Sequence, residues 1–209
     1  YAYKKSLGFG NLGIGVSLGF YNEGYKNSEW RTPDDVLNGS SGGQDQGIPQ
    51  GETSQMAFDA GLGLYLSNNH YFLGLSTTHL NQPSIKFDEY ATTYLARHYY
   101  LMGGYNIKLS DPLFELQPTF MLKSDLASWQ LDLNANIVFD ERFWGGISYR
   151  FQDAVALLMG MEMVNGLKVG FSFDLVTASW GYYGYGSYEL FISYSIDLER
   201  NRNQKYKSV

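Results

Sequence analysis

The sequence predicts an all-β protein, an antiparallel up-and-down β-barrel that crosses an outer membrane with its strands. Three observations lead to this prediction. About ten segments alternate apolar and polar residues, and each is about as long as a strand that crosses a bilayer. The polar faces of these segments carry charged side chains. The connections between the segments are long on one side of the predicted sheet and short on the other.

The alternation is clearest in the segment 127–139. Its apolar positions are Trp129, Leu131, Leu133, Ala135, Ile137 and Phe139. Its polar positions are Ser128, Gln130, Asp132, Asn134 and Asn136. Successive side chains of a strand point to opposite faces, so this strand has one apolar face and one polar face.

Periodicity of the same kind predicts the remaining strands. In chain order we expect strands at 7–20, 57–66, 70–79, 97–108, 114–123, 127–139, 142–151, 153–163, 167–175 and 187–197. Lys4 and Lys5 are expected in a turn after an earlier strand that ends at Tyr3. Pro118 lacks a backbone donor and predicts a bulge or local distortion in its strand.

The connections supply a check that does not depend on the periodicity. Three of them are long, namely 21–56, 80–96 and 176–186. They are the first, third and ninth connections, so an up-and-down order places all three on one side. The opposite side has short turns, including Asn165-Gly166, which is a strong hairpin signal. Outer-membrane barrels have short periplasmic turns and longer outer loops.

This parity gives the predicted domain an orientation in the outer membrane. We expect a single barrel domain over 1–198, with long loops outside the cell and a periplasmic tail over 199–209. The tail carries four basic residues, so it is either a disordered end or a segment that docks on a periplasmic partner. We also expect further strands upstream of residue 1, which would bring the barrel to about 14 strands.

Composition narrows the possible functions. The chain has no cysteine, which excludes disulfides, thiolate metal sites and a cysteine nucleophile within it. A net charge of −6 argues against a nucleic-acid partner. No run of 18 apolar residues is present, so no transmembrane helix is expected. We expect no cofactor, no metal ion and no catalytic residue.

Charged residues on the predicted inward face form the first candidate site. This lumen polar network comprises Asp132, Arg150, Glu162, Lys168, Asp174 and Glu189. A soluble barrel would bury these charges at high cost, whereas a membrane barrel turns lipid outward and can keep a wet or charge-paired interior. A soluble β-sandwich with a solvated polar face is the alternative. The charges either pair and narrow the lumen or line a channel, and the sequence leaves both possibilities open.

The second candidate site is an aromatic outer loop. Trp180, Tyr182, Tyr183 and Tyr185 alternate with glycines and resemble a protein-binding surface. The same side chains could instead cover the barrel mouth or lie at the membrane interface. The loop 21–56 is rich in acidic residues that could bind calcium, but its spacing is not that of an EF-hand. We interpret that loop as a flexible outer loop.

A hydrolase is a weaker possibility. His98 lies on a predicted polar face, and a histidine can activate a serine hydroxyl on a barrel wall. No nucleophile elbow or paired signature accompanies it. A hydrogen-bonding histidine of the lumen or rim therefore fits His98 better.

Several segments together resemble a known family. Phe143–Arg150 reads FWGGISYR, and this stretch resembles a hallmark of the PorP/SprF outer-membrane proteins of the type IX secretion system of Bacteroidetes. Further similar stretches, in order, are YFLGLSTTHL at 71–80, LQPTFMLKS at 116–124, LDLNANIVF at 131–139, LKVGFSFDLVTAS at 167–179 and GSYELFISYSI at 186–196. The family often has His where this chain has Tyr188, and it usually begins with a signal peptide, an Asn-Pro-Ala segment and several more strands.

The resemblance implies a non-enzymatic outer-membrane barrel that works in protein secretion and gliding motility. Its implied partners are the C-terminal domain of a secreted adhesin, the periplasmic lipoprotein ring of the system, and membrane lipids with lipopolysaccharide. The aromatic loop is our candidate for the adhesin contact. The alternative function is a diffusion channel or transporter for small or apolar solutes.

Overall fold

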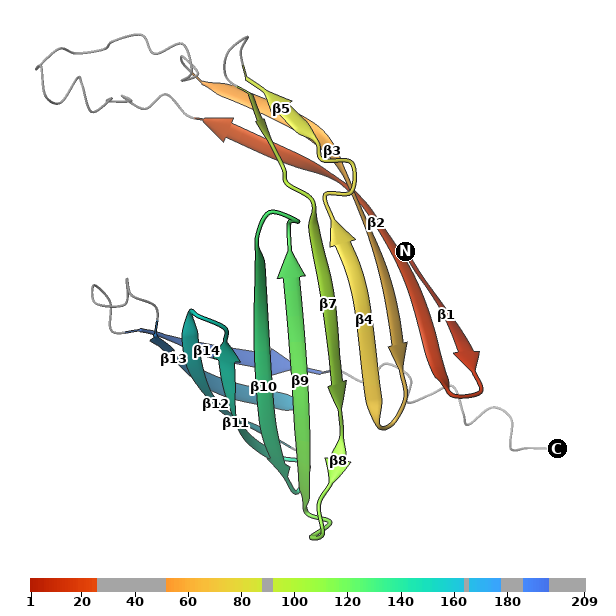
Figure 1. Ribbon diagram of the computed structural model, residues 1–209, viewed down its shortest axis with the longest axis vertical. Coiled ribbons are helices and arrows are strands. Elements are labelled where there is room, and N and C mark those ends of the chain that lie inside the picture. The colour runs from red at the N-terminus through yellow and green to blue at the C-terminus, as the bar shows by residue number, and fades with distance from the viewer. Residues whose placement is uncertain (26–51, 88–91, 164–165, 178–185, 196–209) are drawn as a thin grey trace, which may run out of the picture. The chain divides into compact units, whose positions relative to one another are not determined.

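The computed structural model describes residues 1–25, 52–87, 92–163, 166–177 and 186–195 (Figure 1). Its strands are β1 (Ala2–Leu7), β2 (Gly10–Tyr25), β3 (Thr53–Ser67), β4 (Tyr71–Thr78), β5 (Ser84–Lys86), β6 (Thr92–Tyr94), β7 (His98–Tyr105), β8 (Ile107–Lys108), β9 (Phe114–Ser124), β10 (Trp129–Phe139), β11 (Phe143–Arg150), β12 (Ala154–Glu162), β13 (Leu167–Val176) and β14 (Ser187–Tyr194). The prediction of an all-β, up-and-down antiparallel fold is confirmed.

Most strands belong to one sheet of 12 strands. The hydrogen-bonded order is β1-β2-β3-β4-β7-β9-β10-β11-β12-β13-β14, with β8 paired to β9. This order follows the chain, as expected of a meander that can close into a barrel. β5 and β6 form a separate two-stranded sheet. In the part of the chain that the structure describes, no helix is long and apolar enough to cross a bilayer.

Packing divides the chain into two compact units. The first comprises Tyr1–Ser67, Leu73–Leu101 and Lys123–Trp129, and the second comprises Asn68–Phe72, Met102–Leu122 and Gln130–Val209. The first unit thus contains the β2–β3 hairpin and the small β5–β6 sheet. The second contains β11–β14 and almost all of β10.

The β2–β3 hairpin is longer than the periodicity predicts. Its pairing runs from Asn11 opposite Ser67 to Tyr25 opposite Thr53. The apolar rows end where Phe20 meets Phe58, whose rings lie 5.9 Å apart. Beyond this pair the hydroxyl of Ser54 donates to the side-chain oxygen of Asn22, 2.9 Å away. The alternation stops at Phe20 and therefore predicts that the strand ends there, although the backbone pairing continues to Tyr25.

Two expectations for the N-terminal unit need correction. Lys4 and Lys5 lie inside β1, and the turn falls at Gly8 and Phe9 because Leu7 pairs with Gly10. The lysines suggested a turn because they are charged, but charged side chains, lysine especially, also occur in strands at the edge of a sheet. The connection 80–96 was expected to be a loop, whereas it contains β5 and β6 with Ile85 only 2% exposed. These strands have three residues each, too short for a periodic signal.

Pro118 does not interrupt the strand that contains it. β9 runs continuously through Pro118. A break occurs in the strands that pair with β9, where β7 ends at Tyr105 and β8 begins at Ile107, which pairs with Leu116. Asn106, between them, donates its backbone N–H to the carbonyl of His70 at 2.6 Å.

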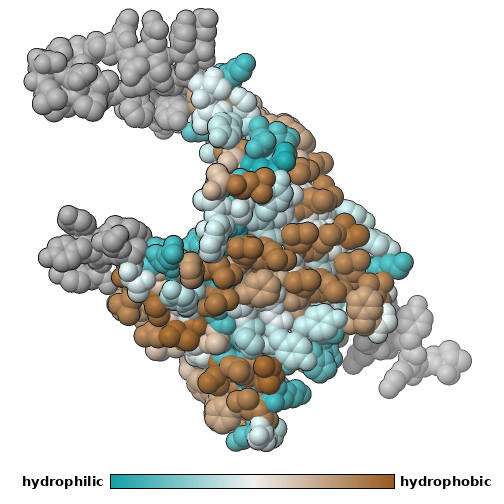
Figure 2. All heavy atoms as spheres, in the orientation of Figure 1, coloured by the Kyte–Doolittle hydropathy of each residue, from teal (hydrophilic) through white to brown (hydrophobic). Residues whose placement is uncertain are grey.

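Strands β10–β14 show the two faces most clearly, because their registers align side chains into rows. Two rows on the outward, apolar face are Ala135–Ile147–Leu157–Phe173–Tyr188 and Phe139–Phe143–Met161–Val169–Ile192. Two rows on the inward face are Asn134–Ser148–Ala156–Asp174–Ser187 and Asn136–Gly146–Leu158–Ser172–Glu189. Many outward apolar side chains are exposed, and apolar side chains form broad patches on the surface in Figure 2. An apolar face of this extent is expected where a sheet meets lipid.

Candidate functional site

The inward face of the second unit carries a cluster centred on Arg150. The Nε of Arg150 lies 3.2 Å from Oδ1 of Asp132, its direct partner across β10 and β11. The Nη1 of Arg150 lies 3.5 Å from Oδ2 of Asp153, and the amide of Gln130 donates to the same oxygen at 3.5 Å. The side chain of Arg150 is 38% exposed, and that of Asp132 is 16% exposed. One guanidinium thus links two carboxylates at the end of β11.

A second ion pair lies at the opposite end of these strands. The Nζ of Lys168 lies 2.7 Å from Oε2 of Glu162, its partner across β12 and β13. Both side chains are more than a third exposed, so this pair contributes little to stability. The predicted lumen polar network therefore separates into two clusters rather than one.

The two remaining members of that network lie in rows between the clusters. Asp174 is opposite Ser187, and Glu189 is opposite Ser172. Within the described residues neither carboxylate forms an ion pair. Asp153 and Gln130 were missed as members of the Arg150 cluster. Gln130 shares its face with Asp132 and was accessible from the alternation. Asp153 was expected at the start of the strand 153–163, where the alternation places it on the apolar face, whereas it lies in the turn before β12.

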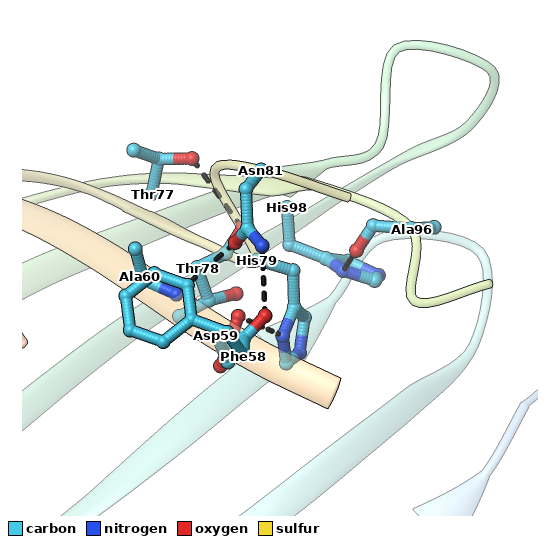
Figure 3. A network of polar contacts seen from close by, with 9 residues as sticks. All are labelled: Phe58, Asp59, Ala60, Thr77, Thr78, His79, Asn81, Ala96 and His98. Carbon is cyan, nitrogen blue, oxygen red and sulfur yellow. Dashed lines mark hydrogen bonds and ion pairs between the residues drawn. The ribbon is translucent and has the colours of Figure 1, made fainter. Parts of the chain in front are cut away.

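In the first unit, an acid–histidine pair joins the end of β4 to β3 (Figure 3). The Nδ1 of His79 lies 3.0 Å from Oδ1 of Asp59, and the two side chains are 28% and 27% exposed. His79 follows β4 with a φ of 53°, a left-handed conformation that is uncommon for residues other than glycine. The backbone turn therefore brings the imidazole back to β3.

Asn81 stabilises this turn because its side chain forms hydrogen bonds with the backbone of β3, as a neighbouring strand would. Its side-chain amide donates to the carbonyl of Phe58 at 2.7 Å, and its side-chain oxygen accepts from the N–H of Ala60 at 3.1 Å (Figure 3). Leu80 adds a backbone bond to the carbonyl of Ala60 at 2.8 Å. One side chain thus satisfies two backbone groups of β3 beyond the end of β4.

His98 is near this pair but makes different contacts. Its Nδ1 donates to the carbonyl of Ala96 at 2.8 Å, and its ring lies 6.4 Å from the ring of His79 and 6.4 Å from that of Tyr100. No serine contacts it among the interactions of the described residues. This geometry provides an oriented histidine without an adjacent nucleophile, which is the arrangement of a hydrogen-bonding rim residue.

A row of aromatic rings and glycines crosses the inward face of the second unit. Trp144 is opposite Gly160, Gly160 is opposite Gly170, and Gly170 is opposite Phe191. A Cβ on either glycine would overlap the neighbouring ring, so the rings lie directly over the glycines. The two rings stack, with centroids 6.0 Å apart and planes at 26°. The sequence pattern places Trp144 on this face but does not predict the glycines beneath it.

The other candidates fall outside the described residues. These are Trp180, Tyr182, Tyr183 and Tyr185 of the aromatic loop, most of loop 21–56, and the tail 199–209. Among the described residues, no group of three or more histidine, aspartate or glutamate side chains could hold a metal ion.

Comparison with known proteins identifies the chain at the level of its family. Residues 1–194 match the model of the family described as type IX secretion system membrane protein PorP/SprF. No curated protein and no solved structure matches the chain. The match covers all strands of the sheet described above. The chain therefore belongs to the PorP/SprF family of type IX secretion system membrane proteins.

Proposed function

We propose that the chain is a non-enzymatic outer-membrane barrel that supports secretion or surface attachment of a partner adhesin by the type IX system. The observation that carries the proposal is the combination of the family match over 1–194 with a sheet whose outward rows are apolar and whose inward rows are polar. A wall of this kind suits a scaffold in the membrane. Its connections are then the parts available to proteins on either side.

Under this proposal the two sides of the membrane have different partners. The aromatic loop with Trp180, Tyr182, Tyr183 and Tyr185 contacts the C-terminal domain of the adhesin outside the cell. The short turns and the tail 199–209 contact the periplasmic lipoprotein ring. Lipids and lipopolysaccharide cover the outward face. Because a bilayer cannot hydrate free strand edges, we also propose that strands upstream cover the edges of β1 and β14 and complete one barrel domain.

The experiment is capture of partners from outer membranes after chemical crosslinking. We expect the wild-type protein to retain an adhesin C-terminal domain and a ring lipoprotein. Replacement of Trp180, Tyr182, Tyr183 and Tyr185 by alanine is expected to remove the adhesin and leave the ring protein. Leu126→Ser, in the connection between β9 and β10, is a matched control because Leu126 is 80% exposed. Recovery of neither partner by the wild type contradicts the proposal.

One observation favours the alternative of a diffusion channel. Two of the charged side chains on the inward face keep contact with solvent, because Lys168 and Glu162 are 40% and 39% exposed. Charged side chains that stay wet are expected along a water-filled lumen. Conductance in planar bilayers tests this alternative, and Arg150→Gln is expected to increase the cation preference of a conducting pore. A purified barrel that does not conduct rules it out.

A further inference from the structure

On the inward face of the second unit, two carboxylates have no cationic partner among the described residues. Asp174 is opposite Ala156 and Ser187. Glu189 is opposite Ser172. Within the part of the chain that the structure describes, neither carboxylate forms a hydrogen bond or an ion pair. Because their neighbours are small, both carboxylates are open to a cationic group that approaches this face.

An aromatic surface lies beside Glu189, one row nearer to the end of β14. Phe191 follows Glu189 by two residues, so both side chains project from the inward face. The ring of Phe191 lies over Gly170 and stacks with the ring of Trp144, and Phe191 is 44% exposed. The face of an aromatic ring attracts an arginine or lysine cation. The rings and the two carboxylates therefore favour the same kind of ligand, a cationic one.

The last inward row before these strands end has the opposite balance of charge. The N–H of Glu162 donates to the carbonyl of Arg142 at 2.7 Å, which continues the register of β11 and β12 and places Arg142 opposite Glu162. Glu162 is in turn paired with Lys168. This row therefore has two cations for one acid. From the strand ends inward, the face is first cationic, then aromatic, then anionic.

The segment that follows β14 has charges in the complementary order. The backbone N–H of Ser195 donates to the carbonyl of Gly166 at 2.9 Å, so Ser195 lies at the end of the sheet where the cationic row is. The acids of the following segment come first, at Asp197 and Glu199. Its basic residues come after them, at Arg200, Arg202, Lys205 and Lys207. A segment that turns back over the inward face places its acids at the cationic row and its bases further in.

The spacing of these residues also matches the face. An extended chain rises about 3.3 Å per residue, so Glu189 lies about 20 Å from Ser195 along β14. After a turn of about four residues, an extended return brings Arg202 to the level of the rings and Lys205 to the level of Glu189. Lys207 then reaches the level of Asp174.

We propose that the tail 199–209 binds to the inward face of β11–β14, with its basic side chains on Phe191, Glu189 and Asp174. The order of charges selects this occupant, and its covalent attachment beside the site gives it a high effective concentration. In a closed barrel this face lines the lumen, so a bound tail narrows the lumen. Binding here competes with the proposed contact of the tail with the periplasmic ring, but it does not require that contact.

The test is disulfide formation in the purified protein in detergent, since the chain has no cysteine of its own. Gln204→Cys in the tail is combined either with Ser172→Cys, opposite Glu189, or with Ser148→Cys. Ser148 is the matched control, because it is also an inward-facing serine but lies two strands away, on β11. We expect the intramolecular disulfide to form at least about fivefold faster with Ser172→Cys, because binding concentrates the tail there. Mass spectrometry of the linked peptides gives both rates.

Removal of charge then tests the cause of the preference. Glu189→Gln together with Asp174→Asn is expected to lower the rate at Ser172→Cys to that of the control position. Asp140→Asn together with Glu141→Gln removes the same number of charges from exposed positions in the turn between β10 and β11. This pair is expected to leave the rate unchanged. Circular dichroism establishes that each variant is folded.

Equal rates at Ser172→Cys and Ser148→Cys overturn the proposal, as does a rate at Ser172→Cys that stays the same without the two carboxylates. A mixture of the single variants Ser172→Cys and Gln204→Cys distinguishes the tail of the same chain from that of a second copy. A disulfide-linked dimer at a rate equal to that of the intramolecular disulfide places the tail of a second copy at the site, and it too overturns the proposal.

Discussion

At the scale of single residues, Asp125 stabilises the tight connection between β9 and β10. Its Oδ1 accepts from the N–H of Ser128 at 2.7 Å, the hydroxyl of Ser128 at 3.0 Å and the N–H of Ala127 at 3.0 Å. The backbone N–H of Ser128, followed by its hydroxyl and the N–H of Ala127, lowers the pKa of Asp125 from its ordinary value of 3.8. The carboxylate thereby holds the turn in which Leu126 adopts a φ of 74°.

This lowered pKa predicts a pH dependence of stability. A carboxyl whose pKa is lower in the folded protein stabilises the fold fully above 3.8, and this contribution disappears as the pH falls through the folded pKa. Asp125→Asn keeps an oxygen acceptor but loses the charge, so we expect part of the acid-side decrease of the urea midpoint to vanish. Ser128→Ala is expected to give an intermediate profile. Identical pH profiles for the wild type and Asp125→Asn would contradict this assignment.

At the scale of elements, strands of the second unit pack large side chains over glycines of the neighbouring strands, which have no side chain. Trp144 and Phe191 lie over Gly160 and Gly170, and the side chain of Asn136 lies over Gly146. Covering a glycine with a ring from the next strand compensates for the packing that a strand glycine lacks. The second unit thus repeats one device along its inward face.

The prediction at this scale concerns two glycines on neighbouring strands. Gly160→Val would force its side chain into the ring of Trp144, so we expect a loss of about 1–3 kcal/mol in the free energy of unfolding. Gly145→Val is the control, because a Cβ there meets only the carbonyl of Leu158 at 3.7 Å. Urea unfolding in the same detergent gives both values. Equal stability of the two variants would show that the ring of Trp144 does not restrict Gly160.

At the scale of the whole molecule, the sheet order and the lengths of the connections imply an orientation. The strands follow one another in a meander, so alternate connections belong to the same side of the sheet. We therefore propose that the long connection that contains β5 and β6 is extracellular and that the turn between β8 and β9 is periplasmic. The chain belongs to a family of secretion system membrane proteins. Its orientation therefore decides which proposed partner meets which side of the sheet.

The absence of cysteine from the chain makes the orientation simple to test. Ser84 in β5 and Ser110 in the turn after β8 are both exposed, and each can be changed to cysteine singly. In intact cells a membrane-impermeant maleimide is expected to label Ser84→Cys. We expect Ser110→Cys to react only after the outer membrane is permeabilised. The reverse pattern would place the short turns outside and exchange the proposed partners.

Much of the fold was predictable because a barrel wall repeats a simple pattern. The alternation gave β10 and β13 to within two residues at each end, and the turn signals gave the short connections. Prediction was wrong where the period was absent. Lys4 and Lys5 lie in an edge strand whose charges resembled a turn, and β5 and β6 are too short for a period to be visible.

The sequence by itself determined the two faces of the strands, the meander and the family resemblance, because each of these depends on a local pattern. The tertiary structure decided which residues meet. It linked Arg150 to both Asp132 and Asp153, joined His79 to Asp59, and placed Trp144 and Phe191 over two glycines. A period of two residues states which face a side chain occupies, but only the register between strands states what lies beside it. Register depends on pairing between distant segments, so these contacts required the folded chain.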